Sequence, residues 1–174
     1  VYMFKVTGRQ LRQMLRYMLR EEAYAGHTEF YQLPSTLRLR YDRAKGDFDY
    51  FTYCGKEVGK EIGDDALFTV GLQNYHFKNI ESFFNISYET ICKLQKPRSV
   101  ATSCQDILME YFREHEKLDA AVDGRMTILP RTALPGESTS IQSIRSALHM
   151  GQDSPAVPLR MLFCRLQFLC GPTP

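Results

Sequence analysis

The residues of this chain best suited to chemistry are basic ones near the N-terminus. Arg9, Arg12, Arg16 and Arg20 recur at spacings of three and four residues, which stacks their guanidinium groups along one face of a helix. Such a row attracts the phosphates of a nucleic acid or of anionic lipid headgroups. A solvated helix face, partly neutralised by nearby glutamates, is the alternative. With the neighbouring segments, the predicted anion-binding residues are Lys5, Arg9, Arg12, Arg16, Arg20, Arg38, Arg40, Arg43 and Lys45.

Motifs of other chemistry are missing from the sequence. The segment GKEVGKE at residues 55–61 lacks the four-residue gap and the Gly-Lys-Ser/Thr of a phosphate loop. No serine nucleophile elbow, HExxH or GxGxxG occurs. The four histidines lie 34 to 49 residues apart, with no carboxylate or cysteine at metal-ligand spacing. We predict a protein that is not an enzyme and has no cofactor, metal or small-molecule substrate; a diffuse site, such as Cys54 with His76, is the alternative.

Charge is divided along the 174 residues, although the net charge is only +2. Residues 1–60 contain 11 basic and 7 acidic residues, whereas residues 61–120 contain 6 basic and 10 acidic ones. This division fits a protein that meets a polyanion on one face, or one that associates with itself head to tail. Charges scattered over a solvated surface are the alternative. The five cysteines are odd in number and show no framework spacing, so we expect them to be reduced.

The elements that must position the arginine row begin with a β-type run over residues 2–6. Thr7 is a candidate N-cap for the helix that follows, and Gly26 lies where that helix would end. Apolar residues at helical spacing define the buried side of this helix: Leu11, Met14, Leu15, Met18 and Leu19. The arginines fall on the opposite side, so the same helix that packs on the core should present them.

Further elements follow from hydrophobic periodicity. We expect a hairpin over residues 37–54, a strand over 67–77, helices over 79–94, 99–121 and 138–150, and a closing strand over 159–170. Exposed loops are expected near residues 130–140 and 151–158. The clearest apolar stripe, which we expect in the main core, consists of Val100, Cys104, Ile107, Leu108, Tyr111 and Phe112. This order predicts a single α+β domain over residues 1–174, with a mostly antiparallel sheet packed against three to four helices.

The opening segment of the chain resembles part of a known protein family. The run Tyr2-Met-Phe-Lys-Val-Thr-Gly8, followed by a helix up to Tyr24-Ala-Gly26, is similar to the start of the folded core in rhabdovirus matrix proteins. The resemblance covers about 26 of the 174 residues. It implies a matrix protein of a negative-strand RNA virus, which self-associates, condenses the nucleocapsid and binds the inner membrane leaflet. Lys5, Arg9, Arg12 and Arg16 would then be the candidates for phosphate contact. The proline-rich late motif usual in that family is missing from this chain.

The function that these observations favour is that of a structural, self-associating protein. We expect a basic face that binds nucleoprotein or RNA and an anionic membrane surface. The location implied is cytoplasmic, at the inner membrane face or in the virion. Two alternatives stay open, namely a protein-binding adaptor domain and an RNA-binding viral regulatory protein.

Overall fold

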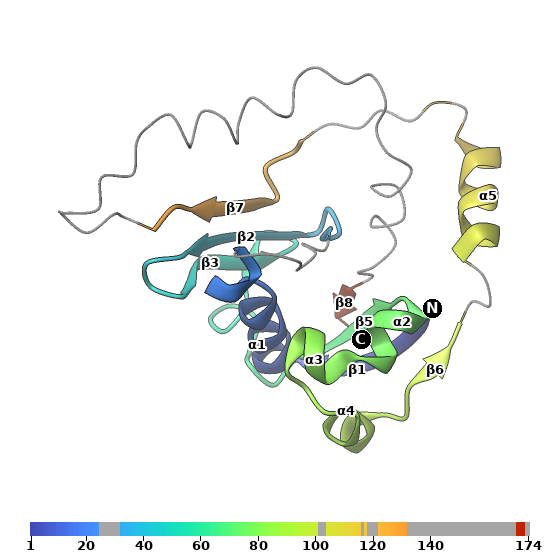
Figure 1. The fold of residues 1–174 in the computed structure, drawn as a ribbon, viewed down its shortest axis with the longest axis horizontal. Helices are drawn as coiled ribbons and strands as arrows, with labels where there is room; N and C mark the ends of the chain where they lie inside the picture. Colours follow the sequence, from blue (N-terminus) through green and yellow to red (C-terminus); the bar gives the residue numbers. More distant parts are fainter. Residues whose placement is uncertain (25–31, 101–103, 116, 118–121, 132–169, 173–174) are drawn as a thin grey trace.

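The computed structural model describes residues 1–24, 32–100, 104–115, 117, 122–131 and 170–172. Its strands form two four-stranded sheets (Figure 1). The first sheet, which is antiparallel, has the order β6 (Arg98–Ser99), β1 (Tyr2–Thr7), β5 (Leu67–Leu72), β8 (Cys170–Pro172). The second has the order β4 (Lys56–Glu57), β3 (Asp47–Tyr53), β2 (Leu37–Asp42), β7 (Met126–Leu129). Only its β2–β7 pair is parallel. The predicted α+β class and the mostly antiparallel pairing are confirmed, and the strands are divided between two sheets.

Helix α1 (Gly8–Met18) begins directly after β1 because Thr7 caps it. The Thr7 hydroxyl accepts a hydrogen bond from the Gln10 amide at 3.2 Å, and the Gln10 side chain accepts one from the Thr7 amide at 2.8 Å. This reciprocal capping satisfies two of the amides that a helix start leaves without partners. The helix ends at Met18 and one 3-10 turn (Glu21–Tyr24) follows, so the predicted end near Gly26 is wrong. The acidic pair Glu21 and Glu22 opposes the helix dipole at that end.

The N-terminus of α1 is held by the loop that precedes β5. The Gly8 amide donates to the Ala66 carbonyl and the Arg9 amide to the Asp64 carbonyl, each at 2.9 Å. A Cβ at Gly8 would lie 3.1 Å from Val58 Cγ1 and 3.3 Å from the Asp64 carbonyl oxygen. A side chain here would therefore push the loop away from the helix, which explains the glycine at the first helical position.

The β2–β3 hairpin matches the prediction for residues 37–54. Its inner face carries Leu37, Leu39 and Phe51, all fully buried, because alternate strand residues point to opposite sides. The ring of Tyr53 meets that of Phe68 on β5 edge to face, with 5.6 Å between centroids. The two sheets therefore share one hydrophobic core.

The segment after β5 differs from the prediction. The strand ends at Leu72 and a short helix, α2 (Asn74–Lys78), replaces the expected continuation to residue 77. The helix expected over residues 79–94 is two helices, α3 (Ile80–Phe84) and α4 (Tyr88–Leu94). Asn85 ends α3 in the left-handed conformation with φ 53°, and Ser87 then caps α4 through its hydroxyl. Hydrophobic periodicity alone does not reveal such a break, because the apolar spacing continues on both sides of it.

Helix α5 (Cys104–Glu114) is shorter than the predicted 99–121. Much of its expected core stripe is exposed to solvent: Val100 is 47% exposed, Tyr111 42% and Phe112 37%. Leu108 is half-buried, and the side chains of Cys104 and Ile107 lie outside the described residues. For the exposed side chains, the prediction that this stripe packs into the main core is wrong.

Several predictions fall on parts of the chain outside the described residues. These are the helix over 138–150, the loop over 151–158, nearly all of the strand over 159–170 and most of the loop over 130–140. Pro130 and Arg131, at the start of that loop, are exposed. Cys54 and Cys92 are free thiols, and the side chains of the other three cysteines lie outside the described residues.

Candidate anion-binding site

The arginine row is positioned by the amphipathic pattern of α1. Leu11, Met14 and Leu15 are fully buried in the core, which fixes the rotation of the helix about its axis. At about 100° per residue, Arg9, Arg12 and Arg16 then fall within an arc of about 60° on another side of the helix. The gathering of these three therefore follows from the buried stripe, whereas Arg20 joins them from the segment that follows the helix.

All four arginines line one hollow of about 520 Å³. Arg9 and Arg12 also line a second hollow of about 420 Å³, whose walls include Asp49, Glu57 and Asp64. The walls of the first hollow come from α1 and the segment just after it, the β2–β3 hairpin and the end of α3, and consist of Arg9, Arg12, Gln13, Arg16, Tyr17, Arg20, Tyr41, Gly46 and Asn85. We call this first site the arginine hollow. Among the described residues that line it, none is acidic. Four guanidinium groups around one concave site make a strong local positive potential, because concave walls focus the field.

Arg12 is the most firmly held of the four. It is half-buried, its Nη2 donates to the Val58 carbonyl at 2.6 Å, and its guanidinium lies over the rings of Phe48 and Phe51 at 5.9 and 5.7 Å. Gly59 stands close by with φ +94°, and a Cβ there would lie 3.3 Å from Arg12 Nη2. Arg12 therefore ties α1 to β3 and contributes a fixed charge to the hollow.

The other three arginines have loose acidic neighbours. Arg9 Nε lies 3.6 Å from Asp64, Arg16 Nε 3.6 Å from Asp47 and Arg20 Nε 3.8 Å from Glu22. These distances exceed those of charge-assisted hydrogen bonds, and exposed pairs of this kind contribute about 0–1 kcal/mol each. The side chains of Arg9 and Arg16 are 70% and 49% exposed. Both can turn from their neighbours to an external anion at little cost.

Arg20 is supported by an aromatic ring. Its guanidinium stacks on Tyr17 with 4.0 Å to the ring centroid, and its Nη1 donates to the Tyr17 carbonyl at 2.7 Å. The two contacts hold the guanidinium against Tyr17, since an arginine stacked on an aromatic face is favourably held.

Arg43 and Lys45, also predicted as anion-binding residues, are engaged in close ion pairs of their own. Arg43 is bound to Glu21 through two guanidinium nitrogens and lies over the Tyr24 ring at 3.9 Å. The hydrogen bond from Arg43 lowers the pKa of Glu21, and burial raises the pKa of Tyr24 to about 12. Lys45 lies 2.7 Å from Asp49 and 3.2 Å from Asp42 across the hairpin turn. The Arg43 contacts hold the hairpin beside the 3-10 turn that follows α1, and the Lys45 pairs lie within the hairpin itself.

Arg38, Arg40 and Lys5 point away from the arginine hollow. Arg38 and Arg40 alternate with the buried Leu37 and Leu39 on β2, so they occupy the outer face of the second sheet. Lys5 lies between the buried Phe4 and Val6 on β1 and faces the other side of the first sheet. The structure therefore does not bring these three residues to the surface that the α1 row occupies.

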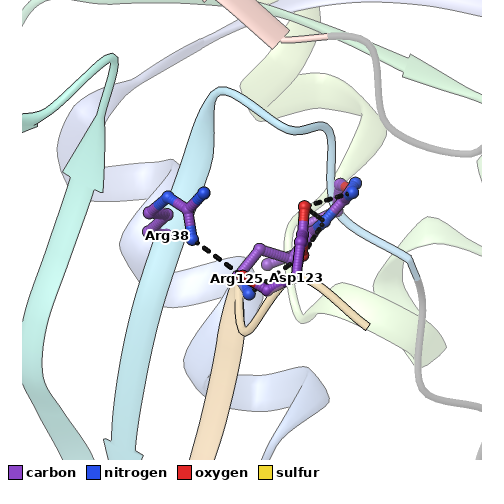
Figure 2. A network of polar contacts seen from close by, with 4 residues as sticks. Arg38, Asp123 and Arg125 are labelled. Atoms are coloured by element: carbon purple, nitrogen blue, oxygen red, sulfur yellow. Dashed lines mark hydrogen bonds and ion pairs between the residues drawn. The ribbon is translucent and has the colours of Figure 1, made fainter. Parts of the chain in front are cut away.

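A second arginine cluster was not found from the sequence. Arg125 clamps Asp123, with Nε donating to both carboxylate oxygens at 2.8 and 2.9 Å, and its Nη1 donates to the Leu33 carbonyl at 2.6 Å (Figure 2). Arg38 Nη1 donates to the Asp123 carbonyl at 3.1 Å. The clamp lowers the pKa of Asp123 to about 2. It anchors β7 beside β2, and the sequence carries no signal for it beyond a short Asp-Gly-Arg turn.

The hollow also contains residues that sequence reasoning missed. Tyr17 and Gln13 were predictable in principle, because they share the polar side of α1 with the arginines. Asn85 and Gly46 come from distant segments, and only the folded chain brings them together.

No protein-family model, curated protein or solved structure matches this chain. The resemblance to rhabdovirus matrix proteins stays a prediction. Among the described residues, no helix has both the length and the apolar character needed to cross a membrane. The same part of the chain contains no group of three or more His, Cys, Asp or Glu side chains placed to hold a metal ion.

Proposed function

We propose that this protein is a non-enzymatic, matrix-like structural protein that self-associates and binds the phosphates of RNA, as in a nucleoprotein, through the arginine hollow. The observation that carries the proposal is the convergence of four arginines on one concave site whose described walls contain no acidic residue. Arg9 and Arg16 make only loose ion pairs with their acidic neighbours. Their charge is therefore available to an external phosphate.

The shape of the site favours RNA over a membrane surface. A basic groove that carries an aromatic side chain is typical of proteins that track a single-stranded backbone, and Tyr17 lies in the wall of this one. Lipid headgroups lie in a plane, which a convex or flat basic surface fits better than a hollow. An anionic membrane is therefore the second ligand to test.

The test compares two matched double variants in binding to labelled single-stranded RNA. Arg9→Gln/Arg16→Gln removes the two most exposed arginine charges of the hollow, and Arg38→Gln/Arg40→Gln removes two from the outer face of the second sheet. We expect the first variant to bind at least tenfold more weakly at low salt. The slope of log affinity against log salt concentration should become shallower by about 1.4 in this variant, since each single-strand phosphate contact contributes about 0.7. The second variant should bind almost like wild type.

Equal losses in the two variants would contradict a localised site. The same proteins are then tested with vesicles that contain phosphatidylserine. Binding to these vesicles, lost in Arg9→Gln/Arg16→Gln, together with no binding to RNA would assign the hollow to a membrane surface instead.

A protein-binding adaptor is a second candidate because α5 exposes large apolar side chains. Met109 is 49% exposed, Tyr111 42% and Phe112 37%. Clustered exposed rings of this kind favour contact with another protein. If a different protein binds these α5 side chains, the adaptor is favoured; if a second copy binds them, self-association is favoured.

A further inference from the structure

One neutral hydrogen-bond donor of the arginine hollow has no partner within the described part of the chain. Tyr41 lies on β2 and lines the hollow, although it is only 4% exposed. Its ring packs edge to face on Phe48, with 5.5 Å between centroids. Its hydroxyl lies at the wall of the hollow, because a Cβ at Gly46, another wall residue, would be 3.9 Å from it. None of the described residues makes a hydrogen bond to this hydroxyl.

The Tyr41 hydroxyl is therefore a donor that a ligand can satisfy. A nearly buried hydroxyl without a partner lowers stability, and such groups in folded proteins normally have one. Burial raises the pKa of Tyr41, and the nearby charge of Arg16 offsets only part of this effect. The hydroxyl consequently keeps its proton at neutral pH and can donate. The partner that fits it is an acceptor that enters the hollow from solvent.

Arg16 supplies a positive charge beside this donor. Its side chain is 49% exposed, and its Nε lies 3.6 Å from Asp47 Oδ1. That oxygen already accepts a hydrogen bond from the Phe48 amide at 2.8 Å, so Arg16 can turn into the hollow without leaving Asp47 unpaired. A tetrahedral phosphate can accept from the hydroxyl with one oxygen and from the guanidinium with others.

From these contacts, and resting on the function proposed above, we infer that the Tyr41 hydroxyl and the Arg16 guanidinium bind one and the same phosphate of the RNA strand. Tyr41 fixes the position of this phosphate because its ring is held in the core, whereas Arg16 supplies the charge. Arg9 lies about 10 Å from Arg16 along the helix, so it contacts a different phosphate. Arg12 and Arg20 donate to backbone carbonyls and contribute their charge from fixed positions.

The variant Tyr41→Phe tests the contact, because it removes the hydroxyl and keeps the buried ring. We expect the affinity for single-stranded RNA to fall about tenfold, since hydrogen bonds to charged groups are among the stronger ones. The slope of log affinity against log salt concentration should equal that of wild type, because a neutral donor displaces no counterion. The matched control is Tyr50→Phe, whose ring lies under Arg40 on the outer face of the second sheet. It should bind RNA like wild type.

Double variants identify which arginine shares the phosphate with Tyr41. Tyr41→Phe/Arg16→Gln should bind RNA at most about twofold more weakly than Arg16→Gln alone, because both substitutions remove the same contact. Tyr41→Phe/Arg9→Gln should show the product of the two single losses, since these side chains contact different phosphates. Wild-type affinity in Tyr41→Phe, a changed salt slope, or independent losses with Arg16→Gln would each overturn the inference.

A measurement on wild type covers the case in which circular dichroism shows that Tyr41→Phe does not fold. In protein with isotope-labelled tyrosine, the NMR resonance of Tyr41 Cζ should shift as RNA is added, whereas that of Tyr50 Cζ should not. Inorganic phosphate should shift the Tyr41 resonance in the same direction at higher concentration. A Tyr41 resonance that does not respond to bound RNA would overturn the inference. A response to inorganic phosphate without one to RNA would also overturn it and assign the hollow to free phosphate.

The arginine variants separate this inference from the proposed function. If Arg9→Gln/Arg16→Gln loses RNA binding while Tyr41→Phe keeps it, only the role of Tyr41 is wrong. If Arg9→Gln/Arg16→Gln keeps RNA binding, the proposed function itself is wrong, and the role of Tyr41 fails with it.

Discussion

Helices α1 and α5 both have 11 residues and an apolar stripe at helical spacing, yet they occupy different environments. The stripe of α1 is buried: Leu11, Met14 and Leu15 have no solvent exposure. On α5, Tyr111 and Phe112 remain 42% and 37% exposed. The comparison teaches that periodicity identifies a helix and its apolar side but not the surface that covers that side. On α1 that surface is the shared core, whereas on α5 these side chains stay exposed.

The largest expected effect comes from truncating the buried stripe of α1. Leu15→Ala should lower the free energy of unfolding by about 2–5 kcal/mol, because a fully buried leucine leaves a cavity in a packed core. Chemical denaturation measures the loss. A change below about 1 kcal/mol would mean that α1 does not pack on the core as the structure has it, and the comparison with α5 would fail.

The next effect concerns the segment that follows α5 in the chain. Arg125→Ala breaks the clamp on Asp123 and leaves the Leu33 carbonyl without this donor. We expect a loss of about 1–2 kcal/mol, since hydrogen bonds to charged groups are among the stronger ones and the site is partly exposed. Hydrogen exchange should show faster opening of β7 than of α1. Equal acceleration in both elements would argue that the clamp supports the whole core.

A smaller effect is expected on α5. Leu108→Ala should lower the free energy of unfolding by about 1 kcal/mol or less, because the half-buried Leu108 keeps less apolar surface from water than Leu15 does. The same denaturation assay as for Leu15→Ala gives the direct comparison. A loss of about 2–5 kcal/mol would place the α5 stripe in a core after all.

The smallest effect is a pH dependence at the clamp. Hydrogen bonds from Arg125 lower the pKa of Asp123 from 3.8 to about 2. The folded state therefore favours the charged form of this carboxylate more than the unfolded state does. Its contribution to stability is complete above pH 3.8 and is lost as the pH falls through about 2. An NMR titration of the Asp123 carboxyl checks the value. In Asp123→Asn, the free energy of unfolding should decrease less as the pH falls from 3.8 to about 2. A carboxyl that titrates near 3.8 would contradict the clamp geometry.

Local signals account for the part of the site that was predicted. Thr7 and Gln10 define the start of α1 through side chains three residues apart, and the buried leucines set its rotation. These are properties of a few neighbouring residues, so the sequence suffices to place Arg9, Arg12 and Arg16 on one face of α1. The break at Asn85 was not predictable in the same way, because a left-handed residue between two apolar runs leaves their spacing intact.

What the sequence by itself determined about this protein is therefore local: the β1–α1 junction, the hairpin, the arginine row on α1 and the α+β class. Only the tertiary structure decided that Arg38 and Arg40 face away from that row, that Arg125 clamps Asp123, and that α5 exposes its rings. The physical reason is that periodicity, capping and turn chemistry act between residues close in the chain. Which face of a strand or helix is covered depends on segments far away in sequence, whose positions are set when the whole core packs.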